Sequence, residues 1–140
     1  MLETILVALD SSDLSQRVIQ ILDQLQIKPA TRIILSQVIP APEPDVEVAV
    51  DRPQASEEVL YRHIEKQLQT YQADLPCKSE LEIVVGDPAN EIIRLAHIHH
   101  ADLVVIGTRG LTGLKRILEG SVSSQVVAEA PCSVLVVKSE

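Results

Sequence analysis

The sequence predicts an α/β fold: an open, parallel, five-stranded sheet of flavodoxin-like or Rossmann-like type, in the order 3-2-1-4-5, with helices on both faces. Five short apolar runs are separated by longer segments with apolar residues at helical spacing. This alternation requires parallel strands joined by right-handed crossovers. The third run alternates polar and apolar residues, which suits an edge strand, whereas the first and fourth are continuously apolar, which suits the centre.

The five runs have the length of strands, are rich in β-branched residues and are bounded by turn-forming residues. They cover residues 5–9, 33–39, 81–85, 103–107 and 134–137. In the order 3-2-1-4-5 the topological switch point lies between strands 1 and 4. Ligands of such sheets bind beyond the carboxyl ends of the strands at that point. We therefore expect a site near the ends of the first and fourth strands.

Four helices are expected between the strands. The first follows a capping box of Asp13 and Gln16 and carries an apolar stripe: Leu14, Val18, Ile21, Leu22 and Leu25. The second carries apolar residues at steps of three and four: Leu60, Ile64, Leu68, Tyr71 and Leu75. The third begins with Asp87 as N-cap and Pro88 at the first helical position, where a missing N–H costs nothing. A short fourth helix is expected over about residues 121–128.

The chain of 140 residues suits one domain spanning residues 1–140. One segment, at about residues 40–58, breaks the pattern with four prolines and six acidic residues against one arginine. It follows the second strand on the side where a ligand is expected. Two interpretations remain open: a lid over that site, or a solvated insertion.

Charge and composition exclude several classes of function. The net charge of −8 argues against a nucleic-acid partner, because such binding needs Lys and Arg to neutralise phosphates. No apolar run approaches the ~18 residues of a membrane span, and the first residues lack the pattern of a signal peptide. The two cysteines, Cys77 and Cys132, are too few for a secreted disulfide framework. We expect a cytoplasmic protein with reduced thiols.

The most informative stretch is the glycine-rich segment 107–121. Gly107 and Gly110 remove side chains where a backbone can approach a ligand closely. The segment is basic, since it holds Arg109, Lys115 and Arg116 against one acidic residue. Gly120 and Ser121 are expected at a helix N-terminus, which is a ready anion site. From the residues alone the segment is either a phosphate-binding loop or an ordinary loop with Ser121 as an N-cap.

The spacing Gly107-x2-Gly110-x9-Gly120-Ser121 resembles the ATP-binding signature of the universal stress protein family. Four further segments resemble the same family: residues 5–12, 84–88, 101–110 and 130–137. The resemblance covers the chain except the insertion at about residues 40–58. It implies an ATP-binding protein of the stress response, acting as a nucleotide-dependent regulatory module on an unknown protein partner.

The resemblance also implies which residues bind the nucleotide. The end of the first strand, at Ala8 and Asp10, lies near ribose and adenine, and the backbone of Val38 faces adenine. The loop around the β- and γ-phosphates comprises Gly107, Thr108, Arg109, Gly110, Gly120, Ser121 and Val122. We expect Mg²⁺ or Mn²⁺ to accompany ATP, because a chain of charge −8 needs help to hold a polyphosphate.

Asp10 is open to three interpretations from the residues alone. It faces the ribose or a magnesium ion, caps the first helix together with Ser12, or accepts a phosphoryl group. Strands 3 and 4 supply no partner Asp and Lys in the places that the last interpretation requires. The cluster His97, His99 and His100 lies at the end of the third helix, where His favours the helix dipole. With no Cys or acidic partner at fixed spacing, we predict no metal site there.

Three functions follow in order of preference: a nucleotide-binding regulatory protein, a slow ATP hydrolase, and a dimeric interaction module that works without nucleotide. No general base aimed at a γ-phosphate can be identified, so we predict no catalytic residues and at most weak ATPase activity. We also predict a homodimer through the C-terminal strand, at about residues 132–138. That strand is expected at the sheet edge, and its apolar run lacks a charge or proline that would block pairing.

Overall fold

The five predicted strands form one sheet. The computed structural model describes residues 3–10, 13–40, 54–108 and 114–138. Its elements are β1 (Thr4–Leu9), α1 (Asp13–Gln24), β2 (Arg32–Pro40), α2 (Gln54–Gln72), β3 (Lys78–Gly86), α3 (Pro88–Ile98), β4 (Leu103–Thr108), α4 (Leu114–Glu129) and β5 (Ser133–Lys138). The strand order is β3-β2-β1-β4-β5 and all four pairings are parallel, which confirms the predicted topology.

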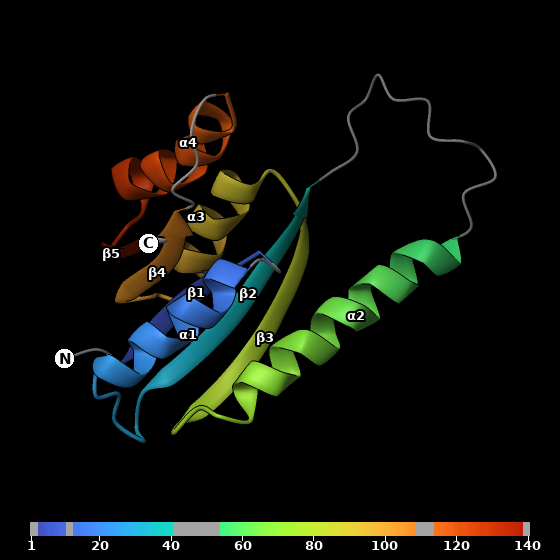
Figure 1. Cartoon of the computed structure of the whole chain (residues 1–140). Coiled ribbons are helices and arrows are strands. Elements are labelled where there is room, and N and C mark those ends of the chain that lie inside the picture. Colours follow the sequence, from blue (N-terminus) through green and yellow to red (C-terminus); the bar gives the residue numbers. More distant parts are fainter. Residues whose placement is uncertain (1–2, 11–12, 41–53, 109–113, 139–140) are drawn as a thin grey trace.

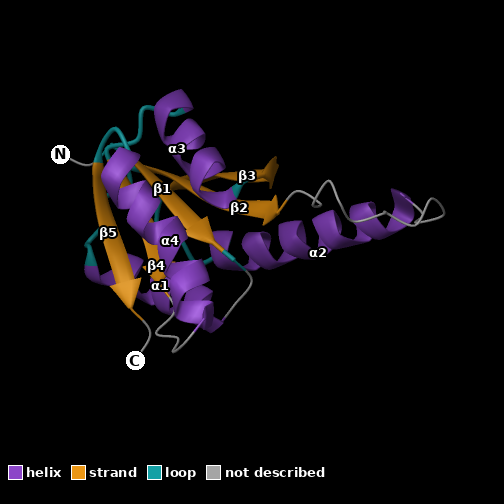
Figure 2. Ribbon diagram, turned by 90° about the horizontal axis from the view of Figure 1, so that it is seen from above, coloured by secondary structure: helices purple, strands orange, loops and turns teal. Residues whose placement is uncertain are grey.

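Helices cover both faces of the sheet (Figures 1 and 2). Side chains of successive strand residues point to opposite faces, so each strand contributes to two cores. Ile5, Val7 and Ile33 pack with α1 and α2 on one face. Leu6 and Ile34 pack with α3 and α4 on the other. All five of these side chains are fully buried, because β1 and β2 lie inside the sheet rather than at its edge.

The turn between β3 and α3 has the predicted cap. The carboxylate of Asp87 accepts a hydrogen bond from the backbone N–H of Asn90 at 3.0 Å, and Pro88 begins the helix. Gly86 precedes this cap with a φ of 158°, and a Cβ at that position would lie 2.8 Å from Cγ of Glu91. Glycine is therefore needed for the chain to turn closely over the first turn of α3.

One predicted boundary is wrong, and one predicted segment overlaps regular structure. The last helix begins at Leu114 rather than near residue 121, because residues 114–119 are strong helix formers that outweigh the ~1 kcal/mol cost of an interior glycine. Gly120 and Ser121 therefore lie inside α4 and not at its N-terminus. The segment at about residues 40–58 overlaps regular structure at both ends, since Pro40 belongs to β2 and residues 54–58 belong to α2.

Within the parts of the chain that the structure describes, none of the helices combines the length and the apolar character that a membrane span needs.

Candidate functional site

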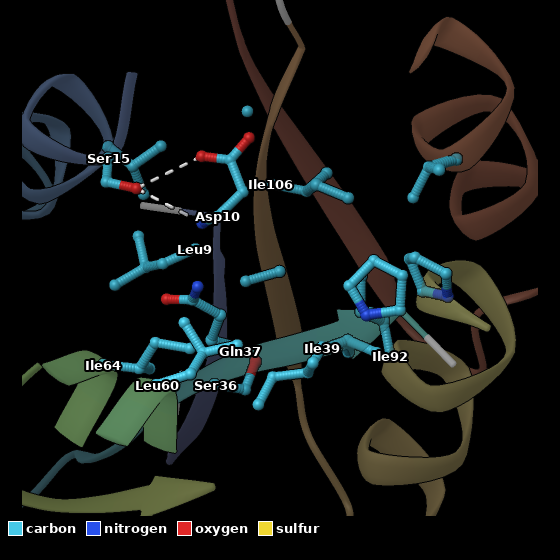
Figure 3. Close-up of a pocket in the computed structure, with 17 residues that line it drawn as sticks. Leu9, Asp10, Ser15, Ser36, Gln37, Ile39, Leu60, Ile64, Ile92 and Ile106 are labelled. Carbon is cyan, nitrogen blue, oxygen red and sulfur yellow. Dashed lines mark hydrogen bonds between the residues drawn. The ribbon is translucent and has the colours of Figure 1, made fainter. Parts of the chain in front are cut away.

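A cavity of about 520 Å³ lies at the carboxyl ends of β1, β2 and β4, where the topology predicts a ligand. Its size falls in the range of small-molecule sites. The walls are mainly apolar and come from strands and helices on both faces of the sheet (Figure 3). The lining residues are Ala8, Leu9, Asp10, Ser15, Val18, Ser36, Gln37, Val38, Ile39, Pro40, Leu60, Ile64, Pro88, Ile92, Ile106, Gly107 and Val122.

On the α3 and α4 face, small side chains leave room for the cavity. Ala8 of β1 pairs with Ser36 of β2 and with Ile106 of β4, so these three residues form one row across the sheet. Ser36 is fully buried, and its hydroxyl donates a hydrogen bond to the carbonyl oxygen of Val7 at 2.8 Å. The hydrogen bond to the backbone offsets the cost of removing this hydroxyl from water.

The first turn of α3 and one residue of α4 close this side of the cavity. Pro88 and Ile92 line it from α3, and Val122 lines it from α4. Ile92 is buried, with 5% of its surface exposed. The cap at Asp87 sets where α3 begins, so it also sets where Pro88 and Ile92 meet the cavity. This side therefore presents an apolar surface at the carboxyl ends of the strands.

On the α1 and α2 face the cavity is lined by longer side chains. Figure 3 shows Leu9, Gln37, Leu60 and Ile64 grouped between α1 and α2. Gln37 is 7% exposed and pairs with Leu9 across the sheet. Leu60 is 45% exposed, so it stands at the mouth of this side. A buried amide among apolar groups supplies a neutral donor and acceptor to the cavity wall.

Asp10 is the charged group of the cavity among the lining residues that the structure describes. It follows β1 directly and is exposed. Its backbone N–H donates to Oγ of Ser15 at 3.3 Å, and that hydroxyl donates to Oδ1 of Asp10 at 3.4 Å. Ser15 belongs to the first turn of α1 and is 2% exposed. The carboxylate is thus tied to α1 by a buried hydroxyl.

The residues predicted from the sequence divide into three groups. Five of them line the cavity: Ala8, Asp10, Val38, Gly107 and Val122. Arg109 and Gly110 lie outside the described residues, and Thr108 ends β4 with its side chain outside them as well. Gly120 and Ser121 lie within α4, so the argument that placed them at a helix N-terminus is wrong.

Sequence reasoning missed most of the other lining residues, among them Ser15, Gln37, Pro88 and Ile92. A signal existed for two of them. Gln37 stands one residue before Val38 at the end of a predicted strand, and Pro88 begins a helix directly after one. Both positions lie at the carboxyl edge of the sheet by topology alone. Ser15 carries no such signal, because its role depends on how α1 folds back over Asp10.

The histidine cluster and the cysteines lie apart from the cavity lining. No group of three or more His, Cys, Asp or Glu side chains within the described residues is arranged to hold a metal ion. Burial raises the pKa of the Cys77 thiol. Burial, followed by the charge of Asp102, raises the pKa of the Cys132 thiol. A raised pKa lowers the thiolate fraction, so neither cysteine has the environment of a nucleophile.

Comparison with known proteins places the chain in a family. The model of the "Universal stress protein family" matches residues 1–138. The chain belongs to the universal stress protein family. Universal stress protein Sll1388 of Synechocystis is 33% identical over 150 residues, covering 96% of each chain. A universal stress protein of Thermus aquaticus is 32% identical over 143 residues, covering 99% of this chain and 100% of that one.

Other matches cover part of the chain or come from solved structures. Universal stress protein MJ0531 of Methanocaldococcus jannaschii is 54% identical over 61 residues, which cover 44% of this chain and 36% of that protein. Among solved structures, the hypothetical protein MJ0577 superposes with a TM-score of 0.83 at 28% identity, over 100% of this chain and 98% of that one. A universal stress protein in complex with cAMP superposes with a TM-score of 0.72 at 24% identity, over 98% and 97%. These superpositions confirm the fold.

Proposed function

We propose that this chain binds ATP without using it as a substrate, in the cavity at the carboxyl end of the sheet. One observation carries the proposal. Five residues that the resemblance to the family assigns to ATP line the same cavity, from the ends of β1, β2 and β4 and from α4. Because the resemblance assigns them from separate parts of the sequence, their convergence on one space supports the assignment. The complex of a universal stress protein with cAMP supports an adenine nucleotide as a ligand of this fold.

The chemistry of the walls fits the parts of a nucleoside. Val38, Ile92 and Ile106 offer apolar surface to a base, and the ends of β1 and β2 offer backbone groups to its edge. A carboxylate accepts hydrogen bonds from hydroxyls, so Asp10 suits a ribose. The phosphates would then extend toward the basic segment after Gly107, where Arg109, Lys115 and Arg116 stand in the sequence.

We propose that Mg²⁺ or Mn²⁺ accompanies ATP. The chain carries a net charge of −8 and the cavity already holds one carboxylate, so a bare polyphosphate would be repelled. Phosphate oxygens are good ligands for these hard cations. The cation would therefore arrive with the nucleotide and neutralise part of its charge.

The proposal is tested first by identifying the nucleotide that the protein carries. Freshly purified protein is denatured, and the released small molecules are separated by chromatography. We expect adenine nucleotide. Calorimetric titration with ATP, AMP and adenosine, each with and without Mg²⁺, then ranks the ligands. We expect ATP with Mg²⁺ to bind most tightly. Equal affinity for adenosine would refute the role of the basic segment, and no binding of any of the three would refute the function.

Slow hydrolysis of ATP is the alternative function that uses the same site. An assay of ATP turnover distinguishes it from binding alone. We propose turnover far below the ~10 s⁻¹ that is typical of enzymes. Release of phosphate is followed with wild-type protein and with Asp10→Asn, which keeps the size of the side chain and removes its basicity. A rate near the enzymatic value that is lost in Asp10→Asn would make the protein an ATPase.

We further propose that the protein acts in the cytoplasm as a homodimer, paired through β5. This strand lies at the edge of the sheet next to β4. Val134, Leu135 and Val136 are only partly buried by the chain itself. An apolar edge without blocking charges favours pairing with another strand. Two copies related by a two-fold axis would pair β5 with β5 in antiparallel fashion, which gives a self-complementary interface.

Light scattering tests the dimer, since a monomer has a mass of 15.3 kDa. Backbone N–H groups of successive strand residues point to opposite edges of the strand. One of the two variants Leu135→Pro and Val136→Pro therefore removes an outward donor, and the other removes a donor to β4. We expect the first to be a folded monomer and the second to be destabilised. A wild-type monomer at micromolar concentration would refute the proposal, whatever the protein binds.

A further inference from the structure

A hydroxyl at the start of α1 holds the carboxylate of the cavity. Ser15 accepts the backbone N–H of Asp10 at 3.3 Å and donates to Oδ1 of the same residue at 3.4 Å, as Figure 3 shows by dashed lines. Ser15 is 2% exposed, whereas Asp10 is exposed. The buried residue therefore anchors the exposed one.

The two bonds fix both the backbone and the side chain of Asp10. A hydroxyl has one proton and two lone pairs. When its proton is shared with Oδ1, a lone pair remains for the N–H of Asp10, so the two bonds are compatible. Together they restrict the rotation of the carboxylate about Cα–Cβ. An exposed carboxylate without such a bond samples several rotamers, and ordering it on binding costs free energy.

The direction of this carboxylate matters because of its charge. It accepts hydrogen bonds from sugar hydroxyls, but it repels a phosphate. Among the described residues that line the cavity, Asp10 is the single charged one. A rotamer that turns toward the phosphates would weaken binding, and a rotamer that turns toward the sugar would strengthen it.

We propose that Ser15 is a positioning residue that holds Asp10 toward the ribose hydroxyls and so makes the site prefer ribonucleotides over deoxyribonucleotides. This inference rests on the proposed function. The two hydrogen bonds, of 3.3 and 3.4 Å, leave room to shorten when a sugar hydroxyl engages the carboxylate.

A purely structural role for Ser15 makes a different prediction. In that case the hydroxyl serves only to join β1 to α1, and its removal lowers stability without changing which sugar is preferred. Discrimination between ATP and 2′-deoxy-ATP is therefore the decisive quantity, since a structural role does not alter it. A comparison with 3′-deoxy-ATP identifies which hydroxyl is involved.

The test compares dissociation constants of the full chain for ATP, 2′-deoxy-ATP and 3′-deoxy-ATP by calorimetry with Mg²⁺ present. A net hydrogen bond corresponds to about a fivefold change in affinity. We expect Ser15→Ala to weaken ATP about fivefold and to weaken the deoxy analogue that lacks the relevant hydroxyl less than twofold. Ser15→Thr keeps the hydroxyl and should therefore keep the wild-type ratio of the dissociation constants for deoxy-ATP and ATP. In an Asp10→Ala background, Ser15→Ala should have no further effect on ATP.

Ser123→Ala is the matched control, because Ser123 is a buried serine of α4 outside the cavity lining. It should leave the ratio unchanged. If Ser15→Ala does not fold, Ser15→Cys replaces it with a near-isosteric side chain of weak donor strength.

Failure of this inference and failure of the proposed function are distinguishable. One outcome overturns the positioning role alone: wild-type protein binds ATP, and the ratio of the dissociation constants for deoxy-ATP and ATP is the same in Ser15→Ala as in wild type. Equal weakening of all three nucleotides assigns Ser15 a structural role and also overturns it. Wild-type protein that binds none of the three overturns both proposals.

Discussion

The two ends of the parallel sheet use polar groups in opposite ways. At the amino end, the carboxylate of Asp102 accepts the backbone N–H groups of Glu3 and Thr4 at 3.0 and 2.9 Å. The backbone N–H of Asp102 also donates to the carbonyl of Thr4 at 2.8 Å. At the carboxyl end, the carboxylate of Asp10 accepts the hydroxyl of Ser15 at 3.4 Å, and the backbone N–H of Asp10 donates to the same hydroxyl at 3.3 Å, beside a cavity of about 520 Å³.

This contrast between the two carboxylates indicates that the amino end of the sheet contributes to stability and the carboxyl end to binding. Both carboxylates lie next to β1 or β4, at opposite ends of neighbouring strands. Asp102 uses Oδ2 for two short bonds to the backbone at the start of β1, so this carboxylate joins β4 to β1. Asp10 stands at an open edge with long bonds. We therefore expect substitutions at the amino end to change the free energy of unfolding, and substitutions at the carboxyl end to change affinity.

The largest effect is expected from filling the cavity. Ala8→Phe places a ring in the row between Ser36 and Ile106, where the base is proposed to bind. Displacing the base should lower the affinity for ATP about 100-fold, which corresponds to roughly 3 kcal/mol. The free energy of unfolding should change little, because the ring occupies existing space. Calorimetry with ATP and urea unfolding measure the two quantities.

Ala101→Phe is the matched control at the other end of the sheet. Ala101 precedes β4, is 8% exposed and lies in the core under α3 and α4. The added ring has no cavity to enter, so overpacking should destabilise the fold by about 1–3 kcal/mol and leave ATP affinity unchanged. Comparable effects of the two variants on affinity would break the separation between the two ends.

An intermediate loss of stability is expected when Asp102 is replaced, and the size of this loss depends on pH. Backbone hydrogen bonds from Thr4 and Glu3 hold the pKa of this carboxyl below its ordinary value of 3.8. A carboxyl whose pKa is lower in the folded state stabilises the fold at pH values above its unfolded pKa. This contribution is lost as the pH falls through the folded value. Asp102→Ala should therefore unfold at lower urea concentration than wild type at pH 7.

Urea unfolding between pH 7 and pH 2 tests the predicted direction in which the stabilisation by Asp102 changes with pH. The difference between wild type and Asp102→Ala should stay constant at neutral pH and shrink below about pH 4. Affinity for ATP at pH 7 should be the same in both proteins, since Asp102 lies at the end away from the cavity. A difference in stability that grows on acidification would contradict the assigned cause.

Sequence patterns were sufficient for the fold and for part of the site. Strand order followed from where apolar runs are continuous and where they alternate, because burial on both faces leaves no room for polar residues. The cap at Asp87 followed from local chemistry and is confirmed by its bond to Asn90. Local signals of this kind involve residues a few positions apart, which a sequence shows directly.

The unpredicted features depend on residues that are distant in sequence or on competition between local signals. Asp102 binds residues 98 and 99 positions away, and no periodicity reveals such a pair. The cavity arises because Ala8 and Ser36 meet in register, which follows only from strand pairing. The start of α4 differs from the predicted one because strong helix formers precede Gly120 and Ser121, so the helix begins before this pair and continues through it.

The smallest effect is expected at the ion pair between Arg32 and Glu80, also at the amino end. Nη1 of Arg32 lies 3.2 Å from Oε1 of Glu80, and the side chains are 40% and 49% exposed. Exposed pairs of this kind contribute about 0.2–1 kcal/mol, because solvent screens both charges. A double-mutant cycle with Arg32→Ala and Glu80→Ala in urea should give a coupling in that range, and 1 M salt should reduce it.

Substitution of Arg32 should lower the free energy of unfolding more than substitution of Glu80. Its Nη2 also donates to the backbone carbonyl of His99 at 3.3 Å, which joins β2 to the end of α3. Arg32→Ala removes both bonds, whereas Glu80→Ala removes one. The arginine variant should therefore be the less stable of the two. Neither should change the affinity for ATP. A loss of affinity in either variant would show that the amino end is coupled to the cavity, and the division between a stabilising end and a binding end would then have to be abandoned.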